Sequence, residues 1–204
     1  YTTLFRSNRG FIIARRTTGG MDDLFIIDQH AADEKYNYEM LQRDAPLQMQ
    51  QLIQPEVVEL APADELVAAE HVDALCASGF RVSLDDRAPP GTRLRLHALP
   101  TSRDTVYTCA DLEEVLAALR DAPADARVHC ARTRALFASR ACRKSIMIGA
   151  ALEHARMCTV VRHMGEIAQP WNCPHGRPTM RHLASVPGVR ARAPVNWAAL
   201  RHLT

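Results

Sequence analysis

The stretch that decides how this chain folds is residues 24–34, which read LFIIDQHAADE. Its apolar beginning is rich in Ile and Phe, as buried strands are, and it runs directly into Asp28-Gln29-His30. From Ala31 to about Arg43 the composition favours a helix, which Pro46 stops. The stretch therefore predicts a strand that delivers polar side chains to the start of a helix.

The segment before this strand predicts its partner. Residues 10–14, GFIIA, form another apolar run, and TTGG at 17–20 is typical of a turn. Residues 50–55 are expected to be a short linker. Further strands are expected at 57–60, 80–84 and 92–97, and helices at 62–78, 111–120, 132–145 and 153–167. Mixed elements in this order predict an α+β (α/β mixed) fold, with residues 56–127 inserted between 1–55 and 128–204.

His30 and Glu34 are the first candidate ligands of a metal ion. They are four residues apart, so on a helix they project from the same side, one turn from each other. The alternative is an exposed helix N-terminus, where the helix dipole favours Asp33 and Glu34 without any metal. Asp28 ends a buried strand, a position that carries chemistry more often than packing.

Residues 172–178, NCPHGRP, place a thiol and an imidazole two residues apart on a segment that Pro and Gly keep from being helical. A turn can direct Cys173 and His175 to one ion. The alternative is a small buried Cys beside Trp171 and a His that belongs only to the turn. Cys142 is the weakest candidate taken alone, because a buried helical Cys is usually part of a core. Thiolate, imidazole and carboxylate together suit Zn²⁺, and Mn²⁺ less strongly.

Composition limits the classes of function. The net charge is only +2, so the chain alone is expected to hold DNA weakly. No apolar run approaches the roughly 20 residues that span a bilayer, so no membrane association is expected. Tyr1 is not a start methionine, which indicates an excised part of a longer protein. The six cysteines lack close CxxC pairs, and reduced thiols in a nuclear or cytosolic compartment are expected.

Three segments together resemble the nuclease signature of the MutL family, and are similar to its eukaryotic Pms branch. They are DQHA at 28–31 with Glu34 and Glu39, ACR at 141–143, and CPHGRP at 173–178. Flanking residues 33–39 and 137–145 extend the match. The resemblance implies a C-terminal dimerisation domain with a latent, metal-dependent endonuclease that nicks duplex DNA in mismatch repair.

The same resemblance implies roles for individual residues. The zinc ligands would be His30, Glu34, Cys142, Cys173 and His175, with Asp28 and Glu34 catalytic and Mn²⁺ an activating metal. Neighbours that support them would be Gln29, Glu39, Arg143 and Arg177. Residues 1–55 and 128–204 would form the dimerisation and metal-site subdomain, and residues 56–127 an external regulatory subdomain.

The resemblance also implies partners and a location. The segment QQLIQP at 50–55 resembles the family's sliding-clamp contact, with Gln50, Leu52, Ile53 and Pro55 as contact residues for a PCNA-like clamp. An Mlh-type subunit would complete a heterodimer in the nucleus. The contrasting hypothesis is a non-catalytic dimerisation scaffold with a structural zinc site. A structural site is closed by four protein ligands, whereas a catalytic site keeps one position open.

Overall fold

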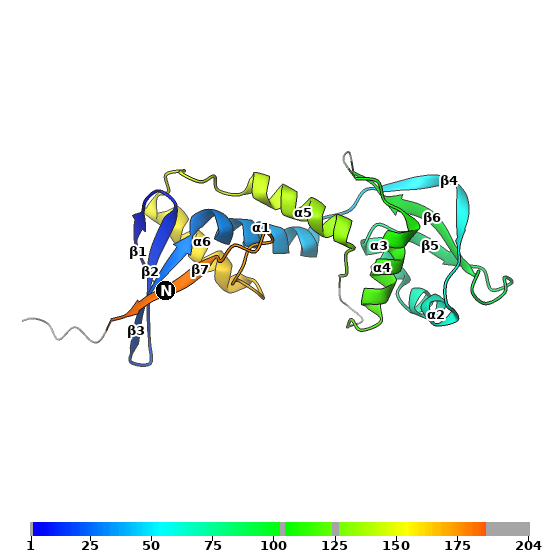
Figure 1. Cartoon of the computed structure of the whole chain (residues 1–204), viewed down its shortest axis with the longest axis horizontal. Coiled ribbons are helices and arrows are strands. Elements are labelled where there is room, and N and C mark those ends of the chain that lie inside the picture. The colour runs from blue at the N-terminus through cyan, green and yellow to red at the C-terminus, as the bar shows by residue number, and fades with distance from the viewer. Residues whose placement is uncertain (1, 103–104, 124–126, 187–204) are drawn as a thin grey trace, which may run out of the picture. The chain divides into compact units, whose positions relative to one another are not determined.

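The computed structural model describes residues 2–102, 105–123 and 127–186 (Figure 1). The chain divides into two compact units. The first consists of Tyr1–Lys35 with Ile146–Thr204, and the second of Tyr36–Ser145. Both contain helices and antiparallel sheet, so the predicted α+β class is confirmed.

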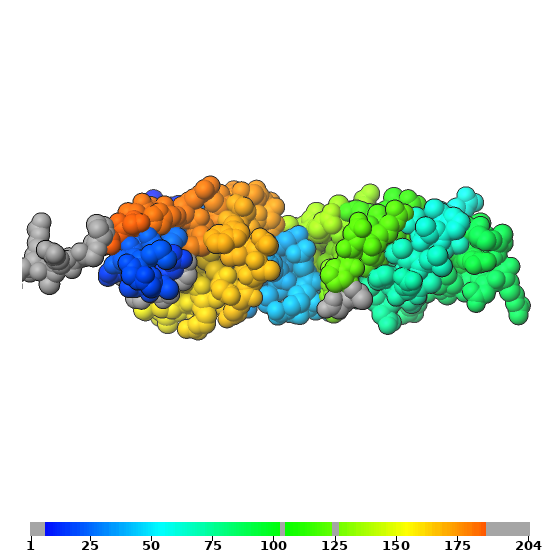
Figure 2. Space-filling view, turned by 90° about the horizontal axis from the view of Figure 1, so that it is seen from below, coloured from blue at the N-terminus to red at the C-terminus, as the bar shows by residue number. Residues whose placement is uncertain are grey.

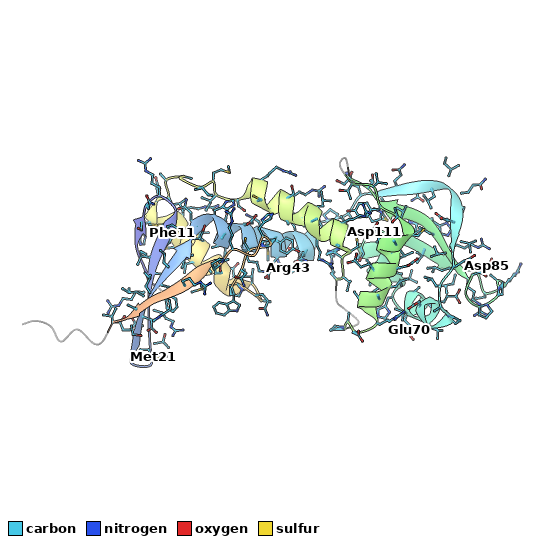
Figure 3. The ribbon with its side chains drawn as sticks, in the orientation of Figure 1. Phe11, Met21, Arg43, Glu70, Asp85 and Asp111 are labelled. Carbon is cyan, nitrogen blue, oxygen red and sulfur yellow. The ribbon has the colours of Figure 1, made fainter. Side chains whose placement is uncertain are left out.

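The first unit is built on a four-stranded antiparallel sheet with strand order β1-β2-β3-β7. Its strands are β1 (Thr2–Ser7), β2 (Phe11–Thr18), β3 (Met21–Asp28) and β7 (Met180–Ser185). Gly19 and Gly20 turn the β2–β3 hairpin with positive φ angles of 59° and 85°, a conformation that glycine adopts without steric cost. Met21 begins β3 directly after that turn (Figure 3).

One helix, α6 (His154–Glu166), covers the core side of this sheet. Met157, Val160 and Met164 recur at helical spacing and form its apolar stripe. They pack against Ile12 and Ile27, which face each other across the β2–β3 pair. In the space-filling view the orange segment that contains β7 lies beside the blue segment that contains β2 and β3, in agreement with the pairing of β7 with β3 (Figure 2).

Helix α1 (Gln29–Asp44) follows β3 without a loop, as the sequence predicts. Its first residues belong to the first unit and its remainder, from Tyr36, to the second. Pro46 lies two residues beyond its last residue, where a proline ring prevents helical continuation.

The second unit contains a three-stranded sheet with strand order β4-β6-β5. Its elements are β4 (Met49–Val58), α2 (Pro62–Glu70), α3 (Val72–Ala77), β5 (Arg81–Leu84), β6 (Leu94–Pro100), α4 (Cys109–Leu119) and α5 (Ala131–Lys144). The central strand β6 alternates buried and half-buried residues. Leu94 and Leu96 from it pack with Leu112 and Leu116 of α4 and with Leu75 of α3 in one apolar core.

Several predicted boundaries differ from the structure. Residues 50–55, expected to be a linker, lie within the strand β4. Residues 49–51 and 56–58 of this strand pair with β6, on either side of an irregularity between Gln51 and Glu56. The helix expected at 62–78 is interrupted at His71 and becomes α2 and α3. Strands β1 and β7 were not predicted, since neither has a long apolar run.

The compact units also begin and end elsewhere than the predicted subdomains. Their boundaries fall after Lys35 and after Ser145, rather than after 55 and 127. The predicted split into dimerisation and external subdomains stays a prediction. The apolar residues Trp197 and Leu200 lie outside the described residues. Their addition to the surface that binds an Mlh-type subunit, which we expect from the apolar character of these side chains, stays a prediction.

Within the described parts of the chain, no helix is both long and apolar enough to cross a bilayer.

Candidate metal centre

The carboxylate of Asp28 begins the site by capping α1. Its Oδ1 atom accepts hydrogen bonds of 2.9 Å from the backbone amides of both His30 and Ala31. These amides lack partners within the helix, so an acidic cap satisfies them and favours helix formation. The cap also sets the direction in which the first turn projects its side chains.

His30 is held in a single orientation by the backbone. Its Nδ1 atom lies 2.8 Å from the carbonyl oxygen of Ile146. A carbonyl oxygen can only accept a hydrogen bond, so Nδ1 carries a proton, and in the neutral imidazole the lone pair is then on Nε2. Metal-binding histidines are oriented by the same kind of contact through their other ring nitrogen.

Asp33 supports this arrangement from the next turn. It is buried, and its Oδ2 atom accepts a 2.9 Å hydrogen bond from the amide of Ile146. The segment whose carbonyl orients His30 is therefore tied down by a carboxylate of the same helix. The sequence suggested only a dipole interaction for Asp33, because its partner is more than a hundred residues away.

Glu34 lies one turn after His30 and is only 1% exposed. The sequence left open an exposed helix N-terminus at this position, and the burial contradicts that interpretation. A buried carboxylate carries a large desolvation cost unless a positive group or hydrogen-bond donors face it.

The segment after Pro170 folds into a tight turn that reaches Glu34. Asn172 and Pro178 form an isolated antiparallel bridge. Inside it, the Cys173 amide donates to the Arg177 carbonyl at 2.9 Å. Gly176 has a φ angle of +82°, which is why glycine suits this position of the turn.

This turn brings Cys173 and His175 to Glu34. One ligand atom from each of the three residues lies within 4.8 Å of the others. The His175 Nδ1 atom is 3.0 Å from Glu34 Oε1, and the Cys173 side chain is buried beside them. Burial and the hydrogen bond to Glu34 raise the pKa of the Cys173 thiol.

The donor set fits a zinc ion. Zn²⁺ binds thiolate, imidazole and carboxylate with bonds of about 2.0–2.3 Å, and three atoms within 4.8 Å can converge on such an ion. A cation would also reverse the local electrostatics, since it stabilises the thiolate that Glu34 disfavours.

A model of the MutL C-terminal dimerisation domain matches residues 7–152. This chain belongs to that family. Its relatives include the mismatch repair endonuclease PMS2 of Gallus gallus, 49% identical over 181 residues, which cover 88% of this chain and 20% of the relative. PMS2 of Homo sapiens is 46% identical over 181 residues, with the same coverage of 88% and 20%.

The DNA mismatch repair protein PMS1 of Saccharomyces cerevisiae is 44% identical over 178 residues, which cover 86% of this chain and 20% of that relative. The predicted resemblance to the MutL family and its Pms branch is confirmed. The chain spans about a fifth of the length of these relatives.

Cys142 and Asp28 are two further predicted site residues of this MutL domain. Cys142 is half-buried on α5 in the second unit, and its place among the zinc ligands stays a prediction. Asp28 has a capping role, and it also lines a pocket with Arg177. Its catalytic role likewise stays a prediction.

The predicted supporting residues are in varied settings. Gln29 is fully buried and donates from Nε2 to the carbonyls of Arg9 and Ala150, at 3.2 and 3.1 Å. Glu39 is half-buried on α1, and the exposed Arg143 on α5 donates to the Ser139 hydroxyl. Of these, Gln29 alone fastens backbone segments next to His30.

The predicted clamp segment lies on β4, at an edge of the three-stranded sheet. Ile53 is fully exposed, while Leu52 packs against the apolar core of the second unit. Gln50 and Pro55 are also exposed. The four residues thus face different surroundings, and Leu52 has a packing role that the sequence did not indicate.

Proposed function

We propose that this chain is the endonuclease domain of a MutL-type mismatch repair protein, and that it nicks one strand of duplex DNA by hydrolysing a phosphodiester bond. The observation that carries the proposal is the convergence of Glu34, Cys173 and His175 from segments about 140 residues apart in the chain. The names of the PMS2 relatives, which are mismatch repair endonucleases, support it.

In this proposal the zinc ligands are Glu34, Cys173 and His175 together with His30 and Cys142, the last two chosen from the family resemblance. Mn²⁺ is proposed as the activating metal. A bound divalent cation would supply Lewis acidity toward a phosphoryl oxygen and lower the pKa of a water molecule.

The chain's own residues prepare that site. Ile146 keeps the proton of His30 on Nδ1, so that Nε2 can act as a ligand. Gly176 allows the turn that presents Cys173 and His175 together. Asp28 is the proposed catalytic carboxylate: one of its oxygens caps α1, and the second can bind a water or an additional ion.

The partners and location are proposed from the family. An Mlh-type subunit would form a heterodimer with this dimerisation domain, and a PCNA-like sliding clamp would contact residues 50–55. Fully exposed Ile53 supports a contact of this type, because an exposed apolar side chain is available to enter a partner's pocket. Activity of this kind would take place in the nucleus.

A non-catalytic scaffold with a structural zinc site is the second candidate. The hydrogen bonds by which Asp28 caps α1 favour the scaffold, since they give this carboxylate a structural role and require no catalytic one. The two candidates make different predictions for an isolated change at Asp28: Asp28→Asn retains one oxygen acceptor for the cap and removes the negative charge. Nicking would be lost in an enzyme, while zinc binding would persist in either case.

The test is nicking of supercoiled plasmid by the chain with Mn²⁺, alone and with an Mlh-type subunit and a clamp. Wild type is compared with Glu34→Gln, which is closer in shape to the buried residue than a lysine. Asp44→Asn, at the exposed end of the same helix, is the control for a lost carboxylate. Nicking by wild type and Asp44→Asn, with none by Glu34→Gln, supports the proposal. Equal nicking by all three contradicts it.

A further inference from the structure

Helix α5 carries positive charge whose compensation changes along its length. Its sequence, ARTRALFASRACRK, contains no acidic residue. In the first turn, Arg132 lies 3.0 Å from a carboxylate oxygen of Asp111, and Arg134 lies 2.9 Å from one of Glu114. The positive charges at this end are therefore neutralised by α4.

The arginines in the second half of α5 differ from those in the first turn in having no carboxylate partner among the described residues. Arg140 and Arg143 are both exposed, and within the described parts of the chain neither forms an ion pair with a carboxylate. Arg143 donates to the hydroxyl of Ser139, one turn earlier on the same helix, at 2.8 Å. A neutral hydroxyl positions this guanidinium group without cancelling its charge.

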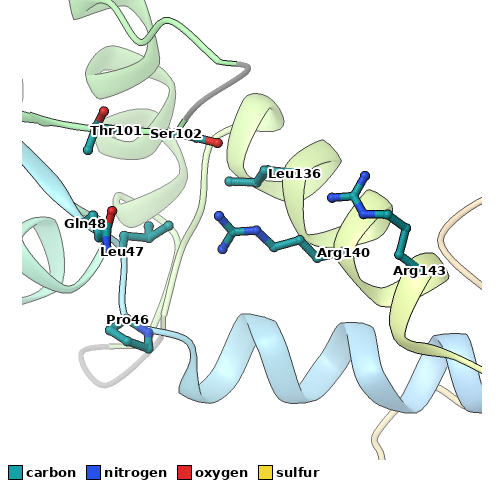
Figure 4. A pocket seen from close by; sticks show the side chains of 8 residues that line it. All are labelled: Pro46, Leu47, Gln48, Thr101, Ser102, Leu136, Arg140 and Arg143. Atoms are coloured by element: carbon teal, nitrogen blue, oxygen red, sulfur yellow. The ribbon is translucent and has the colours of Figure 1, made fainter.

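Both arginines line one pocket of the second unit (Figure 4). Arg140 and Arg143 follow Leu136 at spacings of four and seven, so all three project from the same face of α5. The facing wall includes Gln48, Thr101 and Ser102. That wall is fixed by a 2.8 Å hydrogen bond from the Thr101 amide to the Gln48 carbonyl.

The lining is suited to an anion. It offers two guanidinium groups, two hydroxyls and an amide, and none of the described residues that line it is acidic. Arginine is the preferred partner of phosphate, because its planar fork gives two parallel hydrogen bonds. Aromatic side chains, which stack nucleobases, are also absent from this described lining.

We propose that this pocket binds a phosphate of the DNA backbone through Arg140 and Arg143. This inference rests on the proposed function, since it assigns part of the DNA contact of the same protein. It is distinct from the metal centre: Cys142 follows Arg140 by two residues, so the two side chains leave α5 in different directions. Because the net charge is only +2, attraction to DNA has to come from local groups of positive charge, and Arg140 and Arg143 in one pocket form such a group.

A phosphate could also come from a free nucleotide. The absence of a stacking surface favours the DNA backbone, because a nucleotide normally gains part of its affinity through its base. The two sources are separated by competition: duplex DNA and ATP are compared as competitors for a labelled duplex.

The experiment measures binding of the chain to a labelled duplex in EDTA, where no cutting occurs, over a range of salt concentrations. The double variant Arg140→Gln with Arg143→Gln is compared with wild type. The control is Arg81→Gln with Arg127→Gln, which removes the same charge from exposed positions of the second unit outside the pocket. Melting temperatures of all three proteins establish that they are folded.

Loss of one phosphate contact should lower the magnitude of the slope of log K against log salt by about 0.9, independent of DNA sequence. The control should keep the wild-type slope, and ATP should compete poorly. A wild-type slope in the pocket variant overturns the inference, as does ATP competing as well as duplex DNA. Nicking by wild type is measured separately with Mn²⁺. Nicking with an unchanged slope in the pocket variant rejects the pocket and keeps the proposed function, whereas neither binding nor nicking by wild type rejects both.

Discussion

The two units differ in where their buried polar side chains lie. In the second unit these side chains are spread over several elements, as Glu65, Asp111 and Thr133 are. The second unit has an apolar core in which helices α2, α3 and α4 cover a small sheet. The first unit has a smaller apolar cluster and, at the start of α1, a run of buried polar side chains. These are Gln29, His30, Asp33 and Glu34.

Buried polar groups are costly unless they are satisfied, so the way each one is satisfied is informative. Gln29, His30 and Asp33 all bind backbone groups from distant segments, which is a structural use. Glu34 instead faces the thiol of Cys173 and the half-exposed imidazole of His175. In the second unit the buried carboxylates of Glu65 and Asp111 accept hydrogen bonds from backbone amides. Glu34 differs from them because it faces two side chains that can bind a metal, and the proposed cation accounts for that arrangement.

The largest expected effect is on metal binding. It tests whether Glu34, unlike the other buried polar residues, is buried in order to bind a cation. Replacing this proposed ligand with Gln should weaken zinc binding by at least about 100-fold, since even residues that only support ligands contribute 10- to 100-fold. Competition with a chromogenic chelator measures the affinity, and elemental analysis measures the metal content. Asp44→Asn on the same helix should bind zinc as wild type does.

Unchanged zinc affinity in Glu34→Gln would show that the carboxylate is buried for another reason. Removing zinc should lower the melting temperature of wild type more than that of Glu34→Gln, because a bound metal stabilises the folded state by mass action and the variant binds it more weakly.

The second unit offers the opposite test. Leu116→Ala removes a fully buried side chain from its apolar core and should cost about 2–5 kcal/mol of stability. Because Leu116 packs in an apolar core that contains none of the five proposed zinc ligands, the zinc affinity per folded molecule should stay within about twofold. Urea unfolding measures the first quantity and chelator competition the second. A large loss of zinc affinity would mean that the two interiors are energetically coupled.

The sequence was sufficient to predict those features that depend on residues adjacent in the chain. The step from β3 into α1 was predictable because an apolar run ends at an acidic cap and a helix-favouring composition follows. The thiol and imidazole at 173–178 indicated a candidate metal site from their chemistry, and the structure brings both side chains to Glu34. That they bind a metal stays a prediction. Neither the contact of His175 with Glu34 nor that of His30 with Ile146 could be derived from spacing, because each joins segments more than a hundred residues apart.

Other features depended on tertiary context that no local pattern carries. Strand β7 is almost entirely exposed and lacks alternation, so its pairing with β3 provides the only indication that it is a strand. Residues 50–55 contain a proline and several polar residues, which argue for a linker, yet pairing with β6 on both sides makes them part of β4. Tertiary pairing overrides weak local propensity in both cases.

Two glycines of the first unit allow a comparison between the turn of residues 172–178 and an ordinary helix. Gly176→Ala places a side chain at a positive φ angle in the turn of residues 172–178, and should cost about 1–2 kcal/mol of stability. It should also weaken zinc binding, because Cys173 and His175 depend on that turn. Gly165→Ala lies in α6 with open space around its new methyl group, and should stabilise the protein by about 0.5–1 kcal/mol. Thermal unfolding and zinc titration of both variants give the signs, and two changes of the same sign would contradict this account of the turn.

The smallest expected effect on stability is at the edge strand of the second unit. Ile53→Ala with Gln50→Ala should change the free energy of unfolding by no more than about 0.5 kcal/mol, since both side chains are exposed. Zinc content should also be unchanged. If the segment contacts a clamp, the clamp-stimulated nicking rate should fall severalfold, because truncating an apolar anchor of an interface costs at least about 1 kcal/mol.

Leu66→Ala is the matched control, because it truncates another exposed apolar side chain of the same unit, on α2. Basal nicking without the clamp should be equal in wild type, the double variant and this control. Equal stimulation in all three would leave β4 as a sheet edge whose exposed Ile53 has no clamp-binding role. A fall in stimulation confined to the double variant would instead show that an edge strand can combine both tasks, with Leu52 packed into the core and its neighbour Ile53 directed to a partner.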